Sequence, residues 1–202
     1  MTRLIFVRHG ETAWNVELRF QGQRDTALSA RGRVQAQQVA ERLRHEPIRA
    51  VYSSDLSRAV DTARAIAAVH GLPVVPDAAL RERNFGDWEG CTAAEVRARW
   101  PDGLQHWQRA PHEYTPPHGE SLAAVAARVQ AKIRDIVAAH PDATVVIVGH
   151  GGSIRAAVLT ALNQPLSEWR SVRVDNASLT VLQFHPHGVE VVQLNDLSHL
   201  KT

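Results

Sequence analysis

The sequence predicts an α/β fold, a three-layer α/β/α sandwich built on a mainly parallel sheet. Two uninterrupted apolar runs of strand length, residues 4–7 and 145–148, have the composition of strands buried on both faces. Segments with apolar residues at helical spacing alternate with short strands in the first part of the chain. Because this alternation favours parallel strands joined by right-handed crossovers, we expect helices on both faces of the sheet. A closing hairpin should add an antiparallel strand near one edge.

Caps and helix breakers place the individual elements. Ser29 has the marks of an N-cap, and apolar residues recur after it at helical spacing until Pro47. Ser54 or Asp55 is expected to cap the next helix, which ends at Gly71. The same signals predict strands at residues 48–53, 72–75, 179–184 and 189–194, and helices that begin after Thr92, Ser121 and His150.

The periodic pattern fades between residues 80 and 120. Residues 101–117 are rich in Pro, His and aromatic side chains. Because long irregular excursions rarely persist in compact domains without a function, we expect residues 85–120 to form a lid over the carboxyl ends of the strands. No stretch resembles an inter-domain linker, so residues 1–202 are expected to form a single domain.

Composition excludes several classes of function. The chain has 202 residues, a formal net charge of +2 and no basic cluster, which gives nucleic-acid binding no support. No apolar run approaches the roughly 18 residues that a membrane span needs. The single cysteine, Cys91, excludes an intrachain disulfide framework. We therefore expect a cytoplasmic protein with a small-molecule ligand and neither a nucleic-acid nor a membrane partner. Oligomeric state is undetermined, and a homodimer stays open.

Titratable residues stand at the carboxyl ends of the two apolar strands. Arg8 and His9 follow the first strand and His150 follows the second, with a glycine after each histidine. If the strands are neighbours, the two imidazoles lie side by side at the edge where open α/β sheets bind ligands. A lone histidine at a strand end is more often a packed core or loop residue. The matching pair therefore indicates a site, whereas either residue alone does not.

Short motifs recur in a fixed order around these histidines. They are Arg8-His9-Gly10-Glu11-Thr12 with Asn15, Gln21-Gly22 with Leu28-Ser29, residues 53–59, Leu80-Arg81-Glu82, residues 85–90, Gly119-Glu120-Ser121 and residues 149–152. In this order they resemble the histidine phosphatase superfamily, in its phosphoglycerate mutase-like branch, over residues 4–155. One departure is Asp61, where the family often has Gln. It lies one helical turn from Arg58 and is expected to be able to pair with it.

The resemblance implies a role for each site residue. His9 is the nucleophile that forms a phosphohistidine, and the neighbouring Arg charges should lower its pKa. Arg8, Arg58 and His150 stabilise the charge on the transferring phosphoryl group. Glu82 protonates the leaving alkoxide. The residues expected to bind phosphate or substrate are Asn15, Gln21, Gly22 and Gly151, the last through an amide at a helix N-terminus. No metal or other cofactor is expected, because the arginines supply the positive charge.

Three functions are compatible with these residues. The leading interpretation is a cofactor-independent phosphomonoesterase of the histidine acid/alkaline phosphatase type, acting on a small phosphate ester. The alternative is a 2,3-bisphosphoglycerate-dependent phosphoglycerate mutase, although mutases of the family resemble longer chains and a short lid admits water. The third is a non-catalytic phospholigand-binding module, but a binder need not keep a proton donor such as Glu82. The sequence does not identify the substrate.

Overall fold

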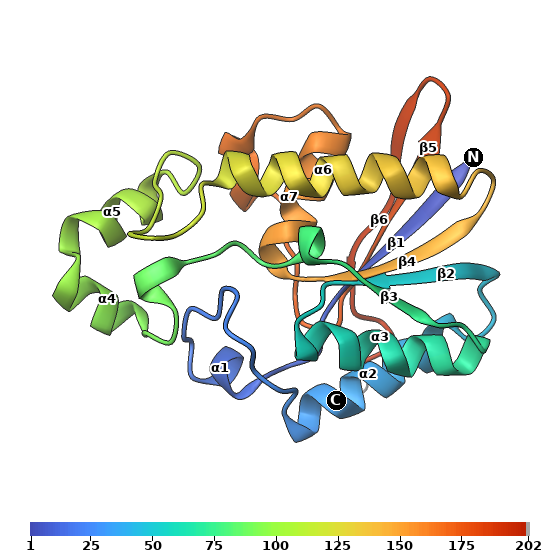
Figure 1. The fold of residues 1–202 in the computed structure, drawn as a ribbon, viewed down its shortest axis with the longest axis horizontal. Coiled ribbons are helices and arrows are strands. Elements are labelled where there is room, and N and C mark those ends of the chain that lie inside the picture. The colour runs from blue at the N-terminus through green and yellow to red at the C-terminus, as the bar shows by residue number, and fades with distance from the viewer. Residues whose placement is uncertain (201–202) are drawn as a thin grey trace.

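A six-stranded sheet forms the centre of the structure, a computed structural model that describes residues 1–200 (Figure 1). The strand order is β3-β2-β4-β1-β5-β6. The strands are β1 (Thr2–Arg8), β2 (Ile48–Ser53), β3 (Val74–Pro76), β4 (Thr144–Gly149), β5 (Leu179–His185) and β6 (Gly188–Asp196). Strands β1, β2, β3 and β4 pair in parallel, whereas β5 is antiparallel to both of its neighbours. The predicted α/β class, with an antiparallel strand near one edge, is confirmed.

Helices cover both faces of the sheet (Figure 1). One face carries α2 (Ala30–Leu43) and α3 (Ser57–His70), and the other carries α6 (Leu122–Ala139) and α7 (Gly151–Ala161). Beyond one end of the sheet lie α1 (Ala13–Val16), α4 (Ala93–Arg99) and α5 (Pro101–Arg109). Short 3₁₀ helices complete the chain: η1 (Ala78–Leu80), η2 (Gly86–Trp88) and η3 (Leu166–Arg170).

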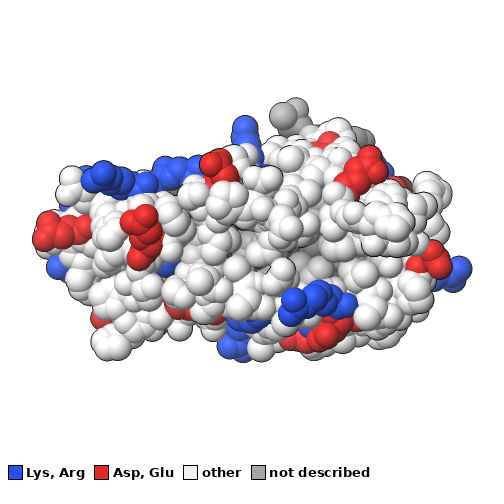
Figure 2. Space-filling view, turned by 90° about the horizontal axis from the view of Figure 1, so that it is seen from above, with Lys and Arg blue, Asp and Glu red and all other residues white. Residues whose placement is uncertain are grey.

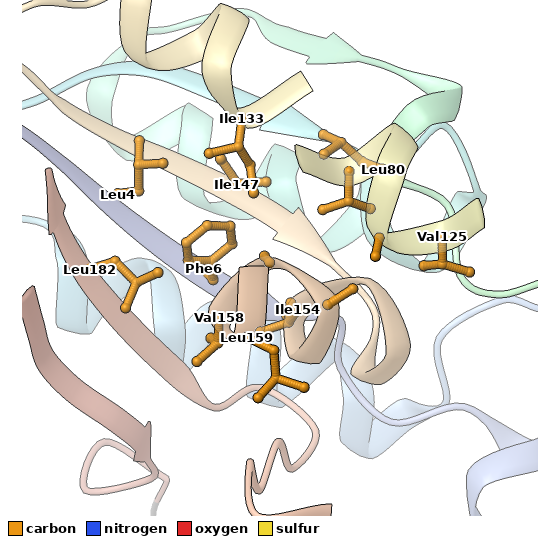
Figure 3. Packing of buried hydrophobic residues seen from close by; sticks show 14 of the residues in the cluster. Leu4, Phe6, Leu80, Val125, Ile133, Ile147, Ile154, Val158, Leu159 and Leu182 are labelled. Carbon is orange, nitrogen blue, oxygen red and sulfur yellow. The ribbon is translucent and has the colours of Figure 1, made fainter. Parts of the chain in front are cut away.

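Alternating side chains of the central strands pack into two separate hydrophobic cores, one on each face of the sheet. Leu4 and Phe6 of β1 point toward α6 and α7, where they pack with Ile147 of β4 (Figure 3). The intervening Ile5 and Val7 belong to the core under α2 and α3. Residues 4–7 of β1 are therefore buried on both faces of the sheet, as their continuous hydrophobic run predicted.

Helix α3 begins differently from the prediction that Ser54 or Asp55 caps it. Its N-cap position is Leu56, whose side chain makes no capping hydrogen bond. The first-turn amide of Ser57 instead donates to Asp25 Oδ1 at 2.8 Å, from a loop 32 residues earlier in the chain. The carboxylate of Asp55 is occupied by Arg81 at 2.6 and 2.7 Å. A residue distant in sequence has therefore taken over the capping role.

The segment between residues 85 and 120 is more regular than expected. Helix α4 follows Thr92 as predicted, with a capping box between Thr92 and Glu95. Helix α5, however, occupies residues that were expected to be irregular, and it starts with Pro101 at its first position, where proline is favourable. A third apolar cluster of Trp88, Val96 and Leu104 holds this segment together.

Charged side chains are dispersed over the face seen in Figure 2. Basic and acidic groups stand in small, separate clusters among larger uncharged areas on that face.

Within residues 1–200, no helix is both long enough and apolar enough to cross a bilayer.

Truncation of Phe6 should strongly destabilise the fold. The ring is 2% exposed and lies in the core under α6 and α7, so Phe6→Ala should lower the free energy of unfolding by about 3–5 kcal/mol. Urea denaturation measures this change. The control is Val34→Ala on α2, where the side chain is 57% exposed and a change within about 0.5 kcal/mol is expected. Equal effects of the two substitutions would contradict the assigned core.

Candidate active site

The pairing of β1 with β4 brings two histidines together at the carboxyl ends of these strands. Arg8 lies opposite Gly149 in the parallel register, and the amide of His9 donates to the Gly149 carbonyl at 3.0 Å. The ring of His150, one residue beyond Gly149, is then 5.1 Å from the ring of His9 between centroids. Both side chains are buried, His9 at 3% and His150 at 0% exposure. Two residues 141 positions apart therefore share one site.

A backbone carbonyl fixes the tautomer of His9. Its Nδ1 lies 2.7 Å from the carbonyl oxygen of Gly10, which can only accept a hydrogen bond. The proton of the neutral ring therefore resides on Nδ1, and the lone pair is on Nε2. His9 lines a cavity of about 580 Å³. The tautomer thus leaves Nε2 free to act as a nucleophile.

Two guanidinium groups lie near the imidazoles, and one of them is fully buried. Arg58 is 0% exposed and donates to the carbonyls of Arg24 and Gly22 at 2.8 and 2.7 Å. Arg8 donates to the carbonyl of Val174 at 2.8 Å. These arginines are anchored by neutral carbonyls, not by carboxylates, so no bonded counter-ion neutralises their charge. Burial lowers the pKa of Arg58 to about 10, which leaves it charged at neutral pH.

Burial is also the main influence on the two imidazoles. It lowers the pKa of His9 well below the ordinary value of 6.5, and the charges of Arg58 and Arg8 add to this effect. The pKa of His150 is also lowered well below 6.5, first by burial, then by the charge of Arg58, with smaller effects from His9, Arg8 and Arg128. The sequence predicted the direction for His9 from the arginine charges alone, whereas desolvation is the larger cause. Both rings are neutral at neutral pH.

Glu82 faces the first turn of α7. Its Oε2 accepts from the amide of Gly152 at 2.9 Å, and its Oε1 accepts from the amide of Arg83 at 2.8 Å. A Cβ atom on Gly152 would lie 1.9 Å from Glu82 Oε1, so only glycine leaves room for the carboxylate here. This carboxylate lines the same cavity as His9.

Arg128 of α6 holds the loop that carries Glu82. Its guanidinium donates to the carbonyls of Ala79, Arg81 and Glu82 at 2.7–3.0 Å. The same group makes a bidentate pair with the carboxylate of Glu120 at 2.7 and 2.9 Å. One side chain thus binds three carbonyls within residues 79–82, which restricts the position of Glu82.

The cavity collects almost all of the predicted site residues. Those that line it are Arg8, His9, Asn15, Gln21, Gly22, Arg58, Glu82 and Gly151. His150 does not line the cavity and instead packs against His9. The remaining wall combines aromatic and basic side chains, namely Arg19, Phe20, Phe85, Trp107, Arg155, Trp169 and Arg170. An anion with an apolar substituent would find both kinds of contact.

Gln21 and Gly22 shape the loop that anchors Arg58. Gln21 Oε1 accepts from the hydroxyls of Thr12 and Thr26, both at 2.8 Å. Gly22 has φ +54°, a conformation that favours glycine, and its carbonyl accepts from Arg58. The contacts of Gln21 and Gly22 therefore hold the loop that positions the Arg58 guanidinium.

Asp61 does not pair with Arg58. Its carboxylate instead accepts from Arg64 Nη1 at 2.9 Å, one turn further along α3. Arg58 is directed by the carbonyls of Arg24 and Gly22. The expected pairing was wrong because the two side chains leave α3 in different directions. Arg58 points inward and is buried, whereas Asp61 is half-buried at the helix surface.

Several residues that shape the site carried no usable signal in the sequence. Arg128 and Asn176 act on loops far away in the chain. Arg155 was detectable, because it stands one helical turn after Gly151 on the predicted helix and so shares its face.

Within residues 1–200, no group of three or more His, Cys, Asp or Glu residues could hold a metal ion.

The chain resembles proteins of one family along nearly its whole length. The family model described as Histidine phosphatase superfamily (branch 1) matches residues 4–197. Phosphoserine phosphatase 1 of Hydrogenobacter thermophilus is 36% identical over 200 residues, which cover 99% of this chain and 95% of the relative. Glucosyl-3-phosphoglycerate phosphatase of Mycobacterium tuberculosis is 41% identical over 192 residues, with 91% and 86% covered. The solved structure of Bacillus stearothermophilus YhfR matches with a TM-score of 0.93 and 35% identity, over 98% and 99% of the two chains.

Acidification through pH 6.5 should destabilise the free protein. Because the pKa values of His9 and His150 are lowered in the folded state, the unfolded chain binds more protons below pH 6.5. Their contribution to stability is therefore complete above pH 6.5. It decreases as pH falls below that value, by at most about 1.4 kcal/mol per pH unit for each ring.

Urea denaturation between pH 7.5 and 5.5 measures this dependence. His9→Asn and His150→Asn should each reduce the slope of unfolding free energy against pH. If both variants kept the slope of the unmodified protein, the two buried imidazoles would not be its source.

Proposed function

The chain belongs to the histidine phosphatase superfamily (branch 1), and we propose that it is a phosphomonoesterase that hydrolyses small phosphate esters through a phosphohistidine. The observation that carries this proposal is the contact between the His9 and His150 rings, 5.1 Å apart, beside the positive charges of Arg58 and Arg8. A neutral nucleophile surrounded by cations matches the needs of phosphoryl transfer, in which charge accumulates on the phosphoryl oxygens.

The first half-reaction transfers the phosphoryl group to His9. The lone pair of Nε2 forms a bond to phosphorus while the bond from phosphorus to the ester oxygen breaks. Arg8 and Arg58 donate hydrogen bonds to the phosphoryl oxygens and stabilise their charge. Glu82, in its protonated form, gives its proton to the departing oxygen, so that an alcohol leaves rather than an alkoxide.

The second half-reaction returns His9 to its starting state. The Glu82 carboxylate takes a proton from water as the water oxygen attacks phosphorus. The bond from phosphorus to Nε2 breaks, inorganic phosphate forms, and Glu82 is again protonated. No group other than water enters the cycle. The lowered pKa of His9 supports an acid-type enzyme, because the nucleophile stays unprotonated below pH 6.5.

We also propose that residues 85–120 act as a lid and that the chain works as a single catalytic domain. Phe85, Trp107 and Pro111 of this segment line the cavity, which supports a role in covering the substrate. Hydrolysis, not mutase activity, is favoured because a short segment leaves water access to the phosphohistidine. The position of Glu82 beside Gly152 argues for turnover over simple ligand binding.

Removal of the nucleophile should separate catalysis from binding. With p-nitrophenyl phosphate as substrate, we expect His9→Ala to abolish phosphate release. Glu82→Gln should lower kcat by about 10²–10⁴-fold, the usual contribution of general acid catalysis. Quenched samples of the unmodified enzyme should contain an acid-labile phosphohistidine that His9→Ala lacks. Full activity of His9→Ala would rule out the covalent route.

A substrate comparison distinguishes the three candidate functions. Phosphate release from a panel of phosphomonoesters indicates a phosphatase. Isomerisation of 3-phosphoglycerate only with a 2,3-bisphosphoglycerate primer would indicate a mutase instead. Phosphate binding without either reaction would indicate a phospholigand-binding module.

Two neighbouring glycines provide a matched steric test of Glu82. In Gly152→Ala the new Cβ would lie 1.9 Å from Glu82 Oε1, so the carboxylate must move. We expect kcat to fall at least tenfold, toward the value of Glu82→Gln. In Gly151→Ala the nearest atom is Arg155 Nη1 at 3.6 Å, an ordinary contact, and kcat should change much less. Equal losses would show that Glu82 is not the affected group.

A further inference from the structure

The turn that leads into β5 packs against the end of β1. The amide of Ala177 donates to the carbonyls of Arg8 and His9 at 3.0 and 3.3 Å. Ala177 is fully buried with φ +59°, an unfavourable conformation for a residue with a Cβ atom. Such strain persists only where the surroundings impose it, and it occurs preferentially at functional sites. The turn is therefore held tightly against the carboxyl end of β1, next to His9.

Asn176 in this turn connects the nucleophile to Asn15. Its Nδ2 donates to the His9 carbonyl at 3.1 Å and to Asn15 Oδ1 at 3.2 Å. Asn15 Oδ1 also accepts from the amide of Thr12 at 3.0 Å. Two donors thus converge on a single carboxamide oxygen.

Two backbone groups fix which atoms of Asn15 and Asn176 face each other. The Thr12 amide can only donate, so the Asn15 atom that faces it must be the oxygen. The His9 carbonyl can only accept, so the Asn176 atom that faces it must be the NH₂ group. The remaining polar atom of the Asn15 carboxamide is Nδ2, which makes no hydrogen bond within residues 1–200. Asn15 lines the cavity, so this NH₂ group is available to a ligand there.

We propose that Asn176 is a positioning residue that holds Asn15 with its NH₂ group toward the transferring phosphoryl group. Without Asn176, only Thr12 holds the Asn15 oxygen, so the carboxamide is less restrained and its NH₂ group is less precisely directed at a phosphate oxygen. This assignment rests on the proposed phosphatase function. Asn176 does not touch the substrate, and its effect passes through the amide of Asn15.

A double-mutant cycle tests whether the two asparagines act as one unit. The variants are Asn15→Ala, Asn176→Ala and the double substitution. Two quantities are measured for each: kcat/KM with p-nitrophenyl phosphate, and the dissociation constant for orthovanadate by calorimetry. Asn195→Ala is the control, because Asn195 bonds Asp175 in the same turn at 2.7 and 2.9 Å without contacting Asn15 or His9.

We expect Asn15→Ala and Asn176→Ala each to lower kcat/KM and vanadate affinity about 10–100-fold, the range for a hydrogen bond to a charged group. The double variant should be no worse than Asn15→Ala. Asn195→Ala should lower the melting temperature yet keep vanadate affinity. If Asn176→Ala does not fold, Asn176→Ser replaces it in the same cycle.

Other outcomes overturn the inference. Losses that multiply in the double variant, or a loss in Asn195→Ala equal to that in Asn176→Ala, would mean that Asn176 only stabilises the turn. An unchanged vanadate affinity in Asn176→Ala would also contradict it. An unmodified protein that binds vanadate but releases no phosphate would refute the proposed function alone, since the vanadate cycle still tests the coupling.

Discussion

The site depends on the parallel pairing of β1 with β4 in one particular register. That register sets Arg8 opposite Gly149, so that the next residue on each strand is a histidine. A slip of one residue would turn each side chain to the other face of the sheet. The same pairing also separates the two cores, because alternate residues of β1 pack under different helix pairs. Folding and the placement of His9 thus have a common cause.

Electrostatics at the site follows from how the buried charges are held. Removing a guanidinium from water is costly unless its donors are satisfied. Arg58 donates to two loop carbonyls and Arg8 to one in the turn before β5, whereas the Nε of each has no partner within residues 1–200. These neutral carbonyls accept hydrogen bonds from the guanidinium groups without cancelling their positive charge. Burial, with a further effect from these cations, keeps both imidazoles unprotonated, and the cations stay available to an anionic ligand.

The sequence was sufficient for features that depend on local patterns. The β1 and β4 runs, the caps at Ser29 and Ser121, and the histidines after the strands follow from periodicity and cap chemistry. Contacts between distant segments could not be predicted this way. The capping of α3 by Asp25 and the clamp of the Glu82 loop by Arg128 both join residues more than 30 positions apart. Helix α5 was missed because its composition suggested an irregular loop.

The third apolar cluster gives residues 85–120 a stability of their own. Trp88, Val96 and Leu104 pack with one another and with neighbouring aromatic rings, separately from both sheet cores. A unit with its own core can open while the rest of the molecule stays folded. Amide hydrogens of α4 and α5 should then exchange with deuterium by a sub-global route. The histidine pair, built on central strands, would remain intact during each such opening.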